Sequence, residues 1–316
     1  MRLLPYCLLL ALATVTTVSA QLTLTASTDR ERYLTDEDIL LKLTVRNNSG
    51  HTLDFGPPDN PGGFVRLEVR DSRGRQLDVK HLPSVDPASR GVTTPRFGVF
   101  NVANDLNLPP GASRTMVVAV NDFFNLTTEG YYEVTARVGH ERLSHHHLSL
   151  PQRIKVQGGV VEWERDVGVP AAEAGQSIAE RKVSVLSFQA DQSQIYCLRI
   201  VDDKYVYTCT RLAPRVRGVI PQFEVDARSQ VHLFIQTQPQ LFSHWVYDMQ
   251  GERKEEAHYI VDQALPIPRL VRDPDIGRVM VVGGRRAKRG VDFNEVELPV
   301  MEAQEISAVP AEARGK

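Results

Sequence analysis

The sequence predicts an all-β protein that is built from two domains. Hydrophobic and polar residues alternate at period two through much of the chain, which is the pattern of half-buried strands. Turn-forming runs such as Asp71-Ser72-Arg73-Gly74 interrupt this alternation at short intervals, as they do in a β-sandwich. The length of 316 residues exceeds that of a typical single domain, and a hydrophobic share of 42% is ordinary for globular cores.

The N-terminus has the pattern of a cleavable signal peptide over residues 1–20. A single Arg2 precedes an apolar run from Leu3 to Val18, and a small-x-small motif ends at Ala20. The run is too short to cross a bilayer, and its end suits signal peptidase. We therefore expect a secreted or periplasmic protein that begins at Gln21 and has no membrane span after signal cleavage.

The overall charge argues against nucleic acid as a partner. The 37 Lys and Arg residues are balanced by 39 Asp and Glu residues, which gives a formal net charge of −2. A protein with this balance has no global field that would draw it onto a polyanion.

The first domain is predicted over residues 21–157. In Ile39–Arg46, positions 39, 41, 43 and 45 are apolar while the residues between them are polar. The segment Phe64–Arg70 repeats this alternation. One face of each strand is therefore expected to be buried and the other exposed to water.

A short motif gives this domain a more specific likeness. Gly130-Tyr131-Tyr132-Glu133-Val134 resembles the G-x-Y-x-C stretch of immunoglobulin-like domains, with Val134 in place of the cysteine. The resemblance implies an immunoglobulin-like sandwich in which Tyr132 is the tyrosine corner. Over residues 35–138 the order of strands and turns is also similar to bacterial sandwich modules, including BsuPI-type proteinase inhibitors.

The second domain is predicted as a smaller all-β domain of hairpins over residues 181–295. Gly158-Gly159 and Pro170–Gly175 mark a change in composition, so a linker is expected over 158–180. The acidic segment 296–316 lacks periodicity and is predicted to be a flexible tail.

Two cysteines remain after the expected cleavage, Cys197 and Cys209. They lie in two β-rich runs, and a hairpin centred on Asp203 would place them opposite each other. Because disulfides persist in exported proteins, this register predicts a structural disulfide. The alternative is a pair of buried free thiols.

The histidine run His145-His146-His147 is the strongest candidate for a metal site. In a strand, His145 and His147 would share a face, with His140 nearby, and two imidazoles suit zinc or copper. A structural metal needs two more ligands, which the neighbouring sequence does not supply. The pattern therefore favours a solvated loop, and we expect no cofactor.

A compact basic run contains Arg285, Arg286, Lys288 and Arg289. It could contact a polyanion, but a solvated hairpin tip explains it equally well.

No catalytic residue can be assigned from sequence. The chain lacks a G-x-S-x-G elbow, an H-E-x-x-H helix and a papain-type cysteine motif. The favoured function is an exported, non-enzymatic binding or structural protein of the cell envelope or extracellular space, whose partner is another protein or an envelope polymer. The alternatives are a peptidase inhibitor that acts through an exposed loop at 82–97, and a glycan- or peptide-acting enzyme with an interdomain site.

Overall fold

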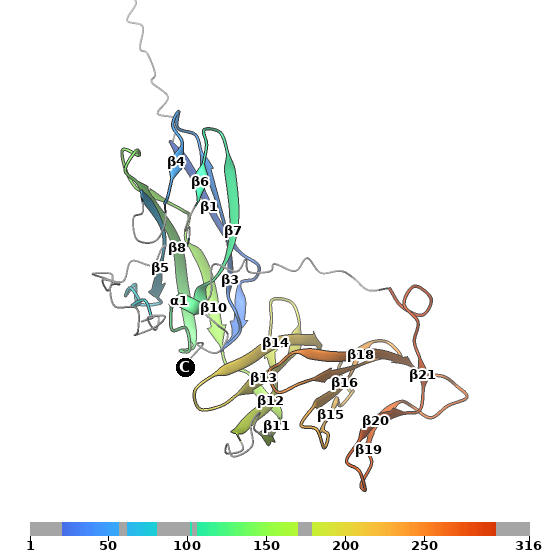
Figure 1. The fold of residues 1–316 in the computed structure, drawn as a ribbon. Helices are drawn as coiled ribbons and strands as arrows, with labels where there is room; N and C mark the ends of the chain where they lie inside the picture. Colours follow the sequence, from blue (N-terminus) through green and yellow to red (C-terminus); the bar gives the residue numbers. More distant parts are fainter. Residues whose placement is uncertain (1–20, 57–61, 81–101, 103–105, 170–178, 295–316) are drawn as a thin grey trace, which may run out of the picture.

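The computed structural model describes residues 21–56, 62–80, 102, 106–169 and 179–294. This part of the chain is all-β apart from one short helix, α1 (Val120–Phe123), which confirms the predicted fold class (Figure 1). The predicted signal peptide at 1–20, the loop at 82–97 and the tail at 296–316 lie outside the described residues. Within the described part, no helix is both long and apolar enough to cross a membrane.

The first domain is a sandwich of two sheets. One sheet has the order β1-β3-β7 and the other the order β2-β10-β8-β5, with β9 beside β8. Their strands are β1 (Leu22–Thr28), β2 (Arg32–Leu34), β3 (Leu40–Asn47), β5 (Gly63–Asp71), β7 (Ser113–Ala119), β8 (Gly130–His140), β9 (His147–Leu148) and β10 (Gln152–Gln157). A short pair, β4 (Leu53–Asp54) and β6 (Asn107–Leu108), accompanies them. The chain passes from β1 in one sheet to β2 in the other, where β2 pairs parallel with β10.

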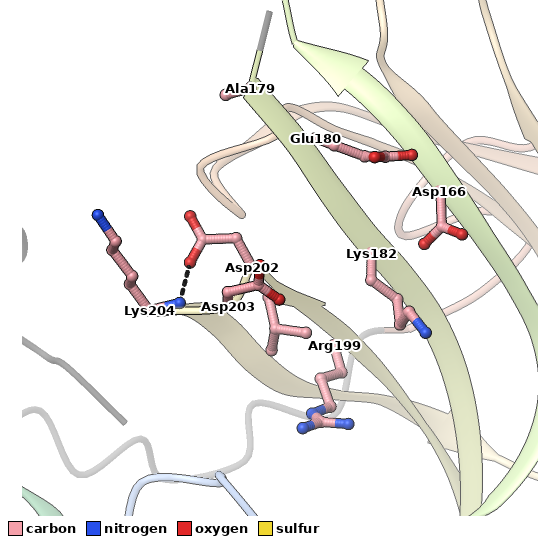
Figure 2. A pocket seen from close by; sticks show the side chains of 9 residues that line it. Asp166, Ala179, Glu180, Lys182, Arg199, Asp202, Asp203 and Lys204 are labelled. Carbon is pink, nitrogen blue, oxygen red and sulfur yellow. Dashed lines mark hydrogen bonds between the residues drawn. The ribbon is translucent and has the colours of Figure 1, made fainter.

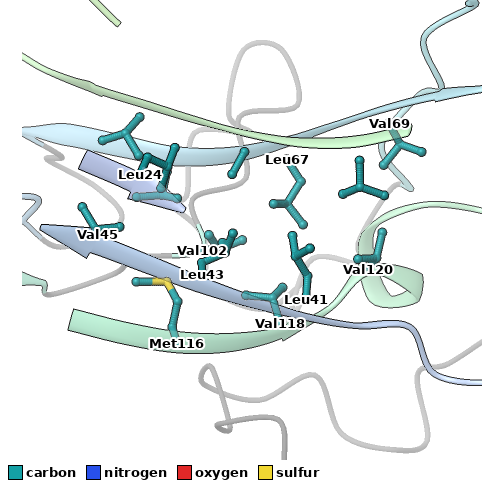
Figure 3. Packing of buried hydrophobic residues seen from close by; sticks show 14 of the residues in the cluster. Leu24, Leu41, Leu43, Val45, Leu67, Val69, Val102, Met116, Val118 and Val120 are labelled. Atoms are coloured by element: carbon teal, nitrogen blue, oxygen red, sulfur yellow. The ribbon is translucent and has the colours of Figure 1, made fainter. Parts of the chain in front are cut away.

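The core of the first domain lies between these two sheets, as Figure 3 shows for side chains from both. Leu41, Leu43 and Val45 of β3 are fully buried, so the alternation in the sequence correctly identifies the buried face. Val134 and Val138 of β8 are buried opposite them. Full burial of one such side chain contributes about 1.5–3 kcal/mol to folding.

Tyr132 lies at the edge of this core. Its ring is 5% exposed, and its hydroxyl donates a hydrogen bond to the carbonyl oxygen of Thr128 at 2.6 Å. A tyrosine corner makes this same contact with the backbone a few residues upstream. The neighbouring Tyr131 points to the other face and is 45% exposed.

The second domain also consists of two sheets (Figure 1). The first has the order β11-β12-β13-β14, from β11 (Val160–Val169), β12 (Ala179–Gln189), β13 (Gln194–Val201) and β14 (Val206–Pro214). The second has the order β15-β16-β17-β18-β21, from β15 (Gln222–Val225), β16 (Val231–Gln238), β17 (Leu241–Tyr247), β18 (Arg253–Ile260) and β21 (Arg285–Arg286). A separate hairpin joins β19 (Arg269–Arg272) to β20 (Val279–Val282). Apolar side chains from both sheets, including Val183, Leu198, Leu233 and Trp245, form the core.

The prediction of a linker over 158–180 is wrong for residues 160–169. Val160–Val169 form β11, which pairs along its whole length with β12, so the second domain begins near 160 and not at 181. The connection between the domains is Gly158-Gly159. A Cβ atom on Gly159 would lie 2.9 Å from a Leu34 methyl and 3.0 Å from Leu186 Cβ, so glycine permits this close approach.

The predicted hairpin register of the cysteines is also wrong. Cys197 lies opposite Arg211, and Cys209 lies opposite Arg199. The turn is tighter than expected, because Asp202 N–H bonds the carbonyl of Tyr205, and a bulge after Ile200 then shifts the strands by another residue. The two cysteines are diagonal neighbours on one face of the sheet, and both are free in the structure.

Candidate functional site

The turn between β2 and β3 points two carboxylates at the second domain. Glu37 N–H bonds the carbonyl of Leu34 at 3.0 Å, and a Glu37 carboxylate oxygen accepts a bond from Leu34 N–H at 2.9 Å. Asp36 has a φ of 71°, in the left-handed region that non-glycine residues seldom adopt. This conformation directs the Asp36 and Glu37 side chains away from the sandwich.

Arginines hold both carboxylates at the domain junction. The Arg211 guanidinium binds both oxygens of Glu37, with one Nη–Oε distance of 3.1 Å, while Arg30 contributes a second bond at 2.9 Å. Arg199 binds Asp36 at 2.6 Å. Glu37 is only 4% exposed. Burial alone would lower the pKa of Arg211, but the Glu37 carboxylate outweighs it and raises that pKa.

An apolar cluster completes the junction. Leu34 of the first domain packs with residues of β12 to β13, among them Leu186, Phe188 and Cys197, and Cys209 packs against the same cluster. Burial raises the pKa of both thiols above the ordinary range. Because the thiolate is the nucleophile, a raised pKa lowers the reactivity of both sulfurs.

Beside this junction the sheet β11-β14 carries an open depression of about 820 Å³, the candidate functional site. Lys182 and Arg199 alternate with the core residues of β12 and β13, so they point outward into it. Figure 2 shows these side chains around the depression together with those of the β13–β14 turn. Its lining consists of Asp166, Ala179, Glu180, Lys182, Arg199, Val201, Asp202, Asp203 and Lys204.

The charges that line the depression are unequally paired. Lys182 binds Glu164 at 3.3 Å, and Arg199 binds Asp36 across the junction. In contrast, Asp166, Glu180 and Asp203 have no side-chain hydrogen bond or ion pair within the part of the chain that the structure describes. The Lys204 ammonium is likewise without an ion pair in the described structure, so three available carboxylates face one available cation.

Asp202 has a separate, structural role at the rim. Its carboxylate accepts bonds from the Lys204 and Tyr205 N–H groups at 2.7 and 2.6 Å and from the Tyr207 hydroxyl at 2.6 Å. Burial would raise the pKa of Asp202, but these hydrogen bonds outweigh it and lower the pKa. The carboxylate therefore stays charged and fixes the turn that carries Asp203.

The structure does not complete a metal site at the histidine run. The rings of His145 and His147 lie 4.5 Å apart, but β9 begins only at His147. His140 is used elsewhere, because Nε2 lies 2.9 Å from the Asp54 carbonyl and Nδ1 accepts a bond from Arg142 N–H. Among the described residues, no three His, Cys, Asp or Glu side chains form a metal-binding group. Burial lowers the pKa of His147.

The basic run at the C-terminal end of the second domain is partly neutralised. Arg285 and Arg286 form β21, which pairs with β18. Arg285 makes a two-pronged ion pair with Asp292 at 2.9 and 2.5 Å, and the Lys288 N–H bonds the same carboxylate. These contacts give the segment from Arg285 to Asp292 a defined structure. Arg286 and Arg289 are exposed in this segment.

A serine–histidine–carboxylate network was not foreseen from sequence, because its members meet only through strand register. Ser243 Oγ lies 3.0 Å from His258 Nδ1, and His258 Nε2 lies 3.5 Å from the Glu256 carboxylate. Ser243 is only 2% exposed, and Glu256 also accepts the Trp245 N–H bond at 2.8 Å. A substrate cannot reach such a serine, so the network is a cross-strand polar layer.

A buried imidazole pair lies on the other face of the same sheet. His232 Nδ1 and His244 Nε2 are 3.0 Å apart, and both residues are nearly inaccessible to water. Burial, followed by the neighbouring His232, lowers the pKa of His244 to about 4. Burial also lowers the pKa of His232, although Asp226 opposes this shift.

Comparison with known proteins assigns no family. No family model matches the sequence, and no curated protein matches it. A family 123 glycoside hydrolase from Clostridium perfringens is 9% identical, with 45% of this chain and 29% of that chain covered and a TM-score of 0.26. Spo0M, a sporulation control protein from Bacillus subtilis, is 10% identical, with 58% and 80% covered and a TM-score of 0.25. Neither likeness bears on function at these TM-scores.

Proposed function

We propose that the protein is an exported, non-enzymatic binding protein of the cell envelope or extracellular space, which holds a cationic group of its partner in the charged depression. One observation supports this proposal. Asp166, Glu180 and Asp203 line the open depression without a side-chain partner among the described residues. Of the three cations in the lining, Lys182 and Arg199 are already paired, which leaves Lys204. A cationic side chain would complete charge-assisted hydrogen bonds there.

These three carboxylates lie on rigid elements of the fold, which favours recognition of a partner. Asp166 and Glu180 belong to paired strands, and Asp203 belongs to a turn that Asp202 fixes. The junction holds this sheet against the first domain. Groups placed on rigid elements lose little conformational entropy when they bind.

The lining argues for binding over catalysis by a nucleophile. It contains no serine, cysteine or histidine, so no nucleophile and imidazole base meet in the depression. An enzyme that acts on glycans or peptides would have to use two of the same carboxylates as acid and base. The segment 82–97, through which an inhibitor would act, lies outside the described residues.

Calorimetric titration of the full mature chain with a short lysine-rich peptide tests the proposal. We expect binding that weakens with added salt, and a matched glutamine-rich peptide should not bind. Asp166→Asn with Glu180→Gln should reduce affinity at least about tenfold. The control pair, Glu141→Gln with Asp275→Asn, removes two exposed carboxylates elsewhere and should change nothing.

Equal losses for the two double variants, or no binding of the cationic peptide, would refute the proposed site. Cleavage of the bound peptide, measured by mass spectrometry of the same samples, would replace the binding function with an enzymatic one.

A further inference from the structure

The outer face of the larger sheet in the first domain has a surplus of positive charge. Its side chains alternate with the buried residues of β5, β8 and β10. We call the following set the basic face: Arg66 and Arg70 on β5, Arg137 on β8, and Arg153 and Lys155 on β10. Glu68 and Glu133 are the carboxylates that these strands place on the same face. The whole chain carries −2, so the surplus is local.

Two arginines of the basic face lie directly opposite each other. The register pairs Arg66 with Arg137, although like charges in this position are destabilising. Glu68 supplies one carboxylate for the pair, at 3.1 Å from Arg137. The Nε atoms of both arginines are buried without a hydrogen-bond partner in the described structure. Burial, followed by the Arg137 charge, lowers the pKa of Arg66. An added carboxylate would relieve this repulsion.

Aromatic rings hold the cations of the basic face in place. The Arg66 guanidinium lies 4.1 Å from the centre of the Phe64 ring, and the Arg153 guanidinium lies 4.6 Å from that of Tyr131. The Lys155 ammonium lies 5.8 Å from the Tyr131 ring. Stacked guanidinium groups are weakly hydrated and already ordered, so they bind carboxylates at a low entropic cost.

Exposed apolar side chains gather beside these cations. In the described part of the first domain, the large hydrophobic residues that remain exposed are Tyr131, Leu148 and Leu150, at 45%, 58% and 81%. Leu148 pairs in register with Arg137 and so shares its face, and the Ser149 N–H bonds the Ala136 carbonyl, which keeps Leu150 alongside β8. Arginine, tyrosine and apolar residues in one patch are the composition of protein interfaces, whereas a site for a plain polyanion needs no exposed leucine.

We infer that the basic face, together with Tyr131, Leu148 and Leu150, binds another protein through a segment that carries both carboxylates and apolar side chains. This inference goes beyond the proposed function, because the surface lies on the other domain and has the opposite charge. Charge complementarity identifies the acidic part of the partner, and the exposed leucines identify its apolar part.

Fluorescence anisotropy of the full mature chain with three labelled peptides tests the inference. The probes alternate Glu with Leu, Gln with Leu, and Glu with Ser. We expect the Glu/Leu peptide to bind at least about tenfold more tightly than either other peptide. Its affinity should fall with added salt. Tighter binding of polygalacturonate, a DNA duplex or phosphatidylglycerol vesicles than of the Glu/Leu peptide would overturn the inference, as would equal binding of all three peptides.

Paired variants locate the binding. Arg66→Gln with Arg137→Gln, and separately Leu148→Ser with Leu150→Ser, should each weaken the Glu/Leu peptide at least about tenfold. The matched controls change exposed residues of the second domain, Arg228→Gln with Arg269→Gln and Ile267→Ser with Ile276→Ser. Equal losses in the controls would overturn the inference.

A stability measurement separates binding from a structural role of Arg66. Arg66→Gln alone should leave the thermal unfolding midpoint unchanged or raise it, because it removes a like-charge pair. A lowered midpoint would assign Arg66 a structural role and count against the inference. The variants Asp166→Asn and Glu180→Gln should leave binding of the Glu/Leu peptide unchanged, so this surface and the depression can fail independently.

Discussion

The core of the first domain and the junction between the domains are stabilised by different interactions. The core buries Leu41, Leu43 and Val45 among other apolar side chains, and its contribution grows with the area removed from water. The junction buries the Glu37 carboxylate between Arg30 and Arg211. Apolar packing tolerates many arrangements, whereas a buried ion pair stabilises only the arrangement in which its partners meet. We therefore expect the ion pairs of the junction to set how the two domains are oriented, while the apolar cluster around Leu34 adds burial.

The largest effect is expected from Glu37→Ala at the junction. The substitution leaves Arg211 and Arg30 without their shared carboxylate and removes the bond to Leu34 N–H. Breaking a buried pair from one side typically costs about 3–5 kcal/mol. Denaturant unfolding of the full chain measures this loss. Glu31→Ala removes a nearby exposed carboxylate and should have no effect. A loss below about 1 kcal/mol for Glu37→Ala, the level of a surface pair, would contradict the comparison.

Leu43→Ala makes the matched change in the sandwich core. Leu43 is fully buried in β3, and such truncations cost about 2–5 kcal/mol through lost burial and the cavity left behind. The loss should be confined to the first domain, which hydrogen exchange of β3 and β13 amides can resolve. Lys42→Ala, on the exposed face of the same strand, serves as the control. Loosening of β13 to the same extent as β3 would show that the core, too, controls the junction.

The sequence predicted the core far better than the junction, for a physical reason. The alternation in Ile39–Arg46 is local, so period two alone identifies which side chains are buried. The junction depends on residues far apart in the chain, since Glu37 and Arg211 are 174 positions apart. Before the fold is known, Asp36 and Glu37 are ordinary turn residues.

Strand register explains the other points at which the predictions from sequence differ from the structure. Cys197 and Cys209 are not directly opposite each other, because a tight turn and one bulge shift β14 relative to β13. No propensity in the sequence marks such a bulge. The depression could not be predicted for the same reason. Asp166 and Glu180 become neighbours of Asp203 only when β11 pairs with β12, in a segment where a linker was expected. Pairing between strands is a non-local property that composition does not encode.

Acid should weaken the second domain through its buried histidines. The pKa of His244 is lowered from 6.5 to about 4, so the folded state disfavours the protonated form. Stability is therefore complete above pH 6.5 and is lost as the pH falls toward 4, because the unfolded chain binds the proton first. The maximum loss is about 3 kcal/mol.

Unfolding free energies measured across this pH range test the expectation. His244→Gln keeps a side chain that can bond His232 but does not titrate, so the slope with pH should flatten. His51→Gln, an exposed histidine of the first domain, should leave the slope unchanged. An unaltered slope in His244→Gln would show that the buried imidazole does not govern acid sensitivity.

The smallest effect is expected at the edge of the sandwich, where apolar burial and one polar contact meet in Tyr132. Tyr132→Phe keeps the buried ring and removes only the hydroxyl that bonds the Thr128 carbonyl at 2.6 Å. The loss should be about 1 kcal/mol, the net contribution of one hydrogen bond. Tyr131→Phe is the matched control, because its ring is 45% exposed and its hydroxyl is not held by the core. Thermal unfolding of the two variants measures the difference, and equal losses would show that the corner contact adds nothing to the packing of the ring.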